Sequence, residues 1–148
     1  MANTTVAEKH QKIKELLKTC YGLQGEIHRL AGENENYLIE TSEERYVLKI
    51  AGSETSEQHI DLERIVVEKL LEQGCTLSLP RVVPLRRAFP TNAGGINSVP
   101  KGHLLEFVEG VPWGGELPVT RRRLEDVGRR IAEVNLLLLS VDHPAGKR

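Results

Sequence analysis

The sequence predicts an α+β fold, in which an antiparallel sheet is combined with helices at its ends and between two of its strands. Short runs of alternating apolar and polar residues, separated by tight polar turns, indicate an antiparallel meander. Longer segments repeat apolar residues at helical spacing. At 148 residues the chain has the length of one ordinary domain.

Three helices are expected. The first runs from Val6 to Thr19 and is stopped by the glycine that follows Tyr21. The second begins after Thr55 or Ser56 and ends near Gln73. The third is capped by Thr120. Its apolar residues are expected to face one way: Leu124, Val127, Ile131, Val134 and Leu138.

Five antiparallel strands are expected, with the second helix between the third and the fourth. They are Gly25–Leu30, Tyr37–Thr41, Arg45–Ile50, Val82–Leu85 and His103–Val108. The segment from Phe89 to Gly102 is rich in Gly, Asn and Pro, which is typical of a long exposed hairpin loop.

Composition and charge exclude several classes of function. Hydrophobic residues make up 39% and charged residues 28% of the chain, which is typical of a globular rather than a disordered protein. A formal net charge of −1 gives no strong attraction to nucleic acid or to an anionic membrane, and 4% aromatic residues argue against a base-stacking RNA surface. Because no stretch is long and apolar enough to span a bilayer, we expect neither nucleic acid nor membrane as a partner.

The N-terminus and the cysteines predict a cytoplasmic protein. The first residues lead into charged helical sequence rather than a signal peptide. Cys20 and Cys75 lack metal-ligand spacing, so reduced, partly buried thiols are expected in preference to a disulfide.

Lys49 is the principal candidate for chemistry. It lies near the end of the run Arg45–Ile50, where alternation predicts that it points inward with the core side chains. A buried ammonium group is costly unless it meets an anion, although a lysine at a strand end could also extend to solvent. A polar turn, Ala31–Asn36, precedes this strand, and an amphipathic helix with carboxylates follows it.

This order of elements, with a lysine on the third strand, resembles the N-terminal lobe of a protein kinase-like phosphotransferase. More narrowly, it resembles the aminoglycoside phosphotransferase and choline kinase-like superfamily. The run Tyr46–Ile50 and the closing Asp142–Arg148 are most similar to the homoserine kinase type II and hydroxylysine kinase branch. The resemblance covers the chain from about Leu16 to Arg148.

The resemblance implies a nucleotide site around Lys49, which would contact the α- and β-phosphates of ATP, bound with Mg²⁺ in this superfamily. It implies a carboxylate partner on the second helix, for which Glu63 is favoured over Glu68. The turn before the second strand would fold over the phosphates with its backbone N–H groups. The turn residues implied are Gly32, Asn34 and Asn36.

The last strand resembles the strand and hinge that hold adenine. The implied hinge residues are Glu106, Phe107 and Val108, of which the first and last would contribute backbone groups. Apolar strand residues would sandwich the base: Leu48, Val82 and Leu105.

The expected organisation has three parts. Residues 1–20 are an N-terminal helix, residues 21–110 a kinase-like nucleotide-binding lobe, and residues 111–148 a linker and the start of a C-terminal lobe. None of the 5 histidines is followed by Gly-Asp or Arg-Asp, as the catalytic loop of the superfamily requires. We therefore expect no catalytic residue and no metal ligand in this chain, weak ATP binding, and an incomplete phosphotransferase that is inactive alone. A hydroxyl acceptor would need the C-terminal lobe.

The alternative is a non-catalytic dimerising or regulatory module with the same fold. The run Leu136–Leu139 holds more leucines than a one-sided helix needs. We expect it to leave apolar surface exposed and to promote self-association.

Overall fold

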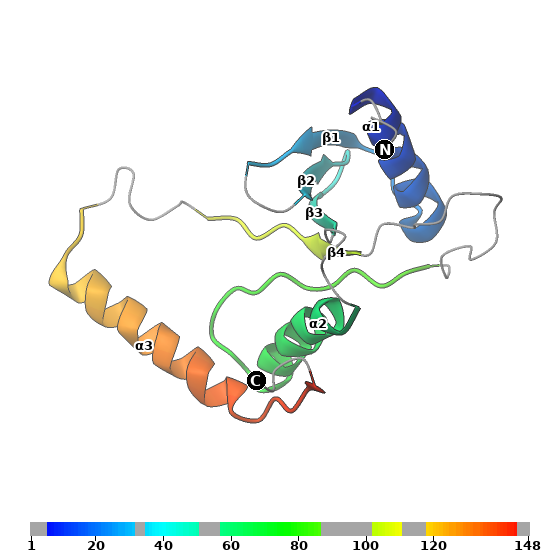
Figure 1. The fold of residues 1–148 in the computed structure, drawn as a ribbon. Helices are drawn as coiled ribbons and strands as arrows, with labels where there is room; N and C mark the ends of the chain where they lie inside the picture. Colours follow the sequence, from blue (N-terminus) through cyan, green and yellow to red (C-terminus); the bar gives the residue numbers. More distant parts are fainter. Residues whose placement is uncertain (1–5, 32–34, 51–56, 87–101, 111–117, 145–148) are drawn as a thin grey trace. The chain divides into compact units, whose positions relative to one another are not determined.

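The structure is a computed structural model that describes residues 6–31, 35–50, 57–86, 102–110 and 118–144. Figure 1 shows its helices and strands, which confirm a mixed α and β architecture. Their bounds, in order, are α1 Val6–Leu16, the π-helical turn η1 Leu17–Tyr21, β1 Glu26–Arg29, β2 Glu35–Glu40, β3 Arg45–Ile50, α2 Glu57–Glu72, β4 Gly102–Glu106 and α3 Arg121–Leu138.

The chain divides into two compact units. The first combines Met1–Ser56 with Val82–Phe107 and contains the sheet. The second combines Glu57–Arg81 with Val108–Arg148 and contains α2 and α3.

The sheet of the first unit is antiparallel, in the order β1-β2-β3-β4. Within the described residues it has four strands, so the expectation of five was wrong. The segment predicted as a further strand makes only an isolated bridge, between Val82 and Leu105, and one backbone bond from Val83 N to Leu104 O, 2.8 Å long. Pro80 precedes this segment and Pro84 lies within it, and a proline has no N–H group to donate to a strand ladder. The hairpin loop expected before β4 lies almost entirely outside the described residues.

One face of the sheet packs on α1 and η1 and forms the core of the first unit. The buried side chains come from both layers: Ile13, Leu17, Cys20 and Tyr21 from the helix, and Tyr37, Ile39, Leu48, Ile50 and Leu104 from the strands. The strand residues alternate along each strand, as the period of two requires. The polar residues between them therefore occupy the opposite face.

The first helix ends at the predicted glycine, but through a turn of a kind that was not predicted. Its last turn is π-helical, and it stops at Gly22, whose φ of 69° is left-handed. The Gly22 N–H donates to Leu17 O at this end. The predicted glycine stop is confirmed, because only glycine adopts this conformation without strain.

In the second unit, the carboxylate of Glu133 on α3 binds the segment that follows α2. The backbone N–H and the hydroxyl of Thr76 donate to Glu133 over 2.7–2.8 Å. The N–H bond comes first among the causes that lower the pKa of Glu133, and Arg130 also contributes. At its other end α3 begins at Thr120, whose side chain accepts from Arg123 N, so the predicted cap is confirmed.

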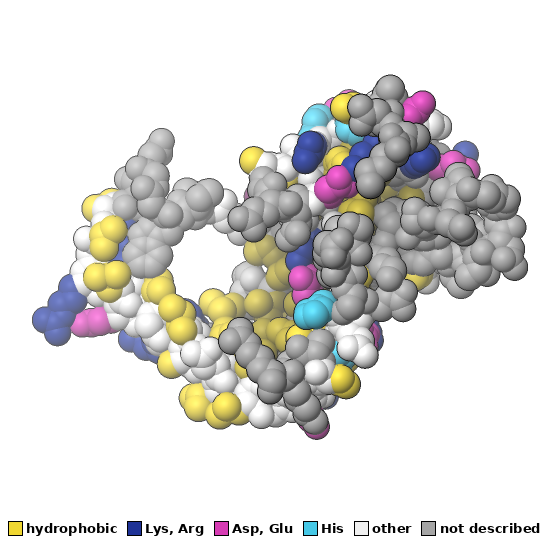
Figure 2. Space-filling model, in the orientation of Figure 1, with side chains coloured by type: hydrophobic (Ala, Val, Ile, Leu, Met, Phe, Trp, Pro, Cys, Tyr) yellow, Lys and Arg dark blue, Asp and Glu magenta, His cyan; other side chains and the backbone are white. Residues whose placement is uncertain are grey.

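No residue of α3 is buried, and several of its large apolar side chains are exposed. Leu136 is 68% and Leu139 is 83% exposed, which confirms that the leucine run leaves apolar surface open. Hydrophobic side chains are visible along this helix in Figure 2.

Both cysteines are free, as expected, with Cys20 buried and Cys75 partly buried. Burial raises the pKa of the Cys20 thiol. Among the described residues, no helix has the length and apolar character needed to cross a bilayer.

Candidate functional site

The face of the sheet opposite the helix carries a polar row across three strands. Asn36 on β2 pairs with Lys49 on β3, and Lys49 pairs with His103 on β4. Directly opposed residues of an antiparallel pair have Cβ atoms about 5 Å apart on one face. The ammonium-bearing chain of Lys49 is therefore flanked by an amide and an imidazole.

An apolar row lies beside the polar one. Leu38, Val47 and Leu105 are in register across the same three strands, two residues further along each of them. Leu38 and Val47 are half-buried, and Leu105 is 9% exposed. Polar groups at one end of a flat apolar strip fit a ligand with a planar apolar part and a charged part.

Asn36 has an unsatisfied atom in this row. Its Oδ1 is buried and has no hydrogen-bond partner within the described part of the chain. Leaving a buried acceptor without a donor costs about 1–3 kcal/mol. The position therefore favours a ligand that brings an N–H or O–H group.

The structure corrects two expectations about β3. Lys49 is half-buried and lies on the face away from the core, so it does not point inward with the core side chains. Leu48, expected to contact the base, is 1% exposed inside the core, on the opposite face from Lys49. Both follow from the same alternation, because neighbouring residues of a strand point to opposite faces.

The two carboxylates proposed as partners of Lys49 lie on α2, in the other compact unit. Glu68 is engaged by Arg64, whose Nη1 lies 3.0 Å from both of its carboxylate oxygens. Glu63 is exposed. The pairing of Glu63 with Lys49 stays a prediction, and its competitor Glu68 already has a cationic partner.

The turn residues are placed only in part. Gly32 and Asn34 lie outside the described residues. Asn36 does not belong to a turn, because β2 begins at Glu35. His103 was not predicted as a neighbour of Lys49, because only the register of β3 and β4 brings the two residues together.

The hinge residues begin at Glu106, the last residue of β4. The Phe107 N–H donates to Arg45 O over 3.0 Å, and the Arg45 guanidinium lies 4.3 Å from the centre of the Phe107 ring. Backbone groups of consecutive strand residues point to opposite edges. Those of Glu106 therefore point away from β3, in the direction that a ligand at this edge would need. Val108 is 37% exposed.

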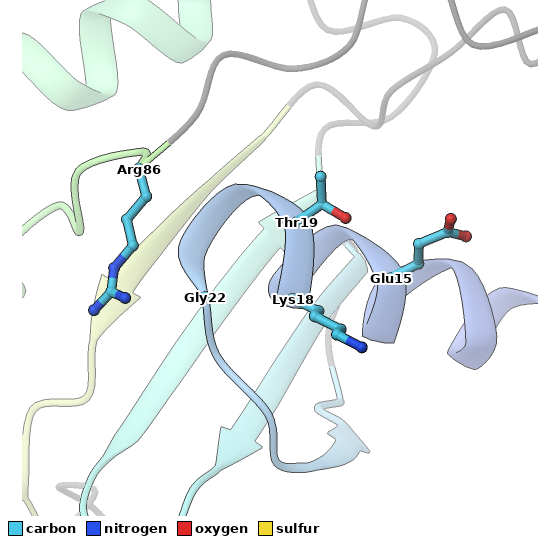
Figure 3. Close-up of a pocket in the computed structure, with 5 residues that line it drawn as sticks. All are labelled: Glu15, Lys18, Thr19, Gly22 and Arg86. Carbon is cyan, nitrogen blue, oxygen red and sulfur yellow. The ribbon is translucent and has the colours of Figure 1, made fainter.

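A second pocket lies at the end of η1. It is lined by Glu15, Lys18, Thr19, Gly22 and Arg86. Figure 3 shows the side chains of Lys18 and Arg86 pointing in different directions, so these two cations do not converge on one ligand. Arg86 instead packs on Gly22, where an added Cβ would lie 2.8 Å from its Nη1.

Comparison with solved structures shows a kinase-like fold. The structure titled "Structure of the microcompartment-associated aminopropanol kinase" matches with a TM-score of 0.63 and 23% sequence identity over 94% of this chain. The chain spans 44% of the length of that protein. No protein-family model matches the chain, and no curated protein matches it.

Proposed function

We propose that this chain is the nucleotide-binding part of an ATP-dependent small-molecule phosphotransferase. The row Asn36–Lys49–His103 beside the apolar row of the sheet carries this proposal. It supplies a cation for phosphates and a flat surface for a base on a fold shared with a kinase. We assign the chain to the aminoglycoside phosphotransferase and choline kinase-like superfamily.

In this proposal Lys49 holds the α- and β-phosphates of ATP, with Glu63 from α2 as its partner. Phosphoryl transfer depends on positioning and on neutralising charge, so a cation fixed on a strand contributes to both. The backbone of Glu106 and Val108 would hold the base at the edge of β4, with Phe107 supported by Arg45. Mg²⁺ would accompany the nucleotide and draw its remaining ligands from the phosphates and water.

The acceptor we propose is a hydroxyl on an amino alcohol or an amino acid. The solved kinase that shares the fold is named for aminopropanol, which is an amino alcohol. Its chain is longer than this one, so acceptor binding and turnover are proposed for a protein that includes a C-terminal lobe. We propose a cytoplasmic location for it.

The proposal is tested by mapping ATP onto the chain with amide NMR. Titration should shift the amide signals of β2, β3 and β4 near the polar row, including those of Asn36, Lys49 and His103. Adenosine should shift signals near Leu105 and leave those near Lys49 unchanged, because it lacks the phosphates. Shifts confined to α1 or α3 would contradict the proposal.

The alternative is a non-catalytic module that associates through α3. The exposure of Leu124 and Ile131, 55% and 56%, together with that of the leucine run, favours it. Apolar surface of this kind is commonly covered by another protein surface. The two proposals differ in whether ATP binds at all.

A further inference from the structure

Three potential metal ligands meet at the edge of the sheet, away from Lys49. The Nε2 atom of His28 lies 3.5 Å from Oε2 of Glu26 and 3.2 Å from Oε2 of Glu40. One ligand atom from each of the three residues lies within 4.8 Å of the others. Glu40 is four residues from Asn36 along β2, about 13 Å at the rise of a strand, so the cluster is separate from the polar row.

Strand geometry explains how the cluster forms. Glu26 and His28 are two residues apart on β1 and therefore share a face. Glu40 is directly opposite Glu26 on β2. His28 can thus reach both carboxylates from one position.

The two carboxylates of the cluster repel each other, and a bound cation would relieve this repulsion. Like charges directly opposite each other across two strands are destabilising. Glu26 and Glu40 form such a pair, and the salt bridges that join them among the described residues run through His28. Arg45 is directly opposite Glu40 on β3, but its guanidinium lies over the ring of Phe107. A neutral imidazole offers a lone pair at the same point, so the three groups match what a divalent ion coordinates.

We propose that Glu26, His28 and Glu40 form a binding site for Zn²⁺ or a similar transition-metal ion. One imidazole nitrogen and two carboxylate oxygens leave a fourth, tetrahedral position for water. Mg²⁺ suits the site poorly, because it prefers an octahedron of oxygen ligands. The ion would join the outermost strand β1 to β2, and its binding does not depend on nucleotide.

The exposure of the ligands allows such an ion to enter. The side chains of Glu26, His28 and Glu40 are 82%, 49% and 42% exposed. Their carboxylates can therefore rotate to close the coordination sphere without moving the backbone. Substitution of these side chains should also leave the fold intact.

The test is calorimetric titration of the intact chain with Zn²⁺ in a buffer that does not chelate it. We expect one equivalent to bind to this site, with at least tenfold loss of affinity in His28→Ala and in Glu40→Gln. Millimolar Mg²⁺ should not displace it. NMR should show the His28 ring signals shifting as Zn²⁺ is added.

His59→Ala is the matched control, because His59 is an exposed histidine on α2 and outside the cluster. It should bind Zn²⁺ like the unaltered protein. Equal affinity in His28→Ala and His59→Ala would overturn the proposal, and so would a site that Mg²⁺ fills equally well. Neither result would test the phosphate contact of Lys49, which pairs with Asn36 and His103 and with no residue of the cluster.

Discussion

At the scale of single residues, the alternation of side chains between the two faces of β3 decides what each of them contacts. Leu48 and Lys49 are neighbours, yet one lies in the core and the other on the opposite face. The bounds of β3 and the presence of Lys49 on it were predictable from the sequence. The face on which Lys49 lies was predicted wrongly, because the pattern of one strand does not show which side a helix covers. Asn36 and His103 lie beside Lys49 because of the register between the strands, and this register cannot be read from the sequence.

Gly102 allows β4 to lie close to β3 beside Lys49. A Cβ at this position would stand 2.0 Å from the carbonyl oxygen of Lys49, and backbone cannot move aside cheaply. We expect Gly102→Ala to lower the free energy of unfolding by about 2 kcal/mol, a typical cost of overpacking. Chemical denaturation measures it. Gly110→Ala is the control, since nothing lies within 4 Å of a Cβ there; equal effects would contradict the close approach.

A hydrogen bond made by Tyr46 causes the stability of the fold to depend on pH. Its hydroxyl donates to Glu44 over 2.6 Å, and this bond, with lesser help from burial, raises the pKa of Tyr46 to about 12. An unfolded tyrosine has a pKa of about 10. The bond therefore stabilises the fold fully below pH 10, and its contribution is lost as the pH rises towards 12.

Titration of tyrosinate absorbance tests this. The folded protein should show one group ionising near pH 12 that is missing in Tyr46→Phe. In Glu44→Gln the same group should ionise at a lower pH, because the neighbouring negative charge is gone. An unchanged titration in Tyr46→Phe would refute the assignment.

At the scale of elements, the helices and β3 were predictable and the sheet edge was not. Helical spacing and the cap at Thr120 fixed α3 correctly. The segment at Val82 has strand-like composition, but a proline before it and a proline within it limit it to one bridge. The start of β2 was placed two residues late, because Glu35 and Asn36 have the polarity of a turn while pairing with β3.

The cap of α3 provides a prediction at this scale. Thr120→Ala removes the acceptor for Arg123 N and should cost about 1 kcal/mol of stability. Thr120→Ser keeps a hydroxyl and should cost little. Helical circular dichroism during thermal unfolding measures both, and identical melting of the two variants would exclude a capping role.

At the scale of the whole molecule, the apolar side chains on α3 and at its C-terminal end are exposed within the part of the chain that the structure describes. We expect the chain to self-associate at micromolar concentrations through this helix, and Leu136→Glu with Leu139→Glu to weaken association at least tenfold. Sedimentation velocity over a range of concentrations tests this. Glu substitution at the exposed Arg129, also on α3, is the control. A monomer at every concentration would contradict the expectation.

The central claim is that Lys49 binds the phosphates of a nucleotide. The decisive measurement is the dissociation constant of ATP for the unaltered chain, for Lys49→Met and for Lys18→Met, an exposed lysine on η1. Losing one charge-assisted contact to phosphate costs about 1.5–3 kcal/mol, so ATP should bind at least tenfold more weakly to Lys49→Met. Lys18→Met should match the unaltered chain, and adenosine should bind all three alike. Equal ATP affinity in the two lysine variants would contradict the claim.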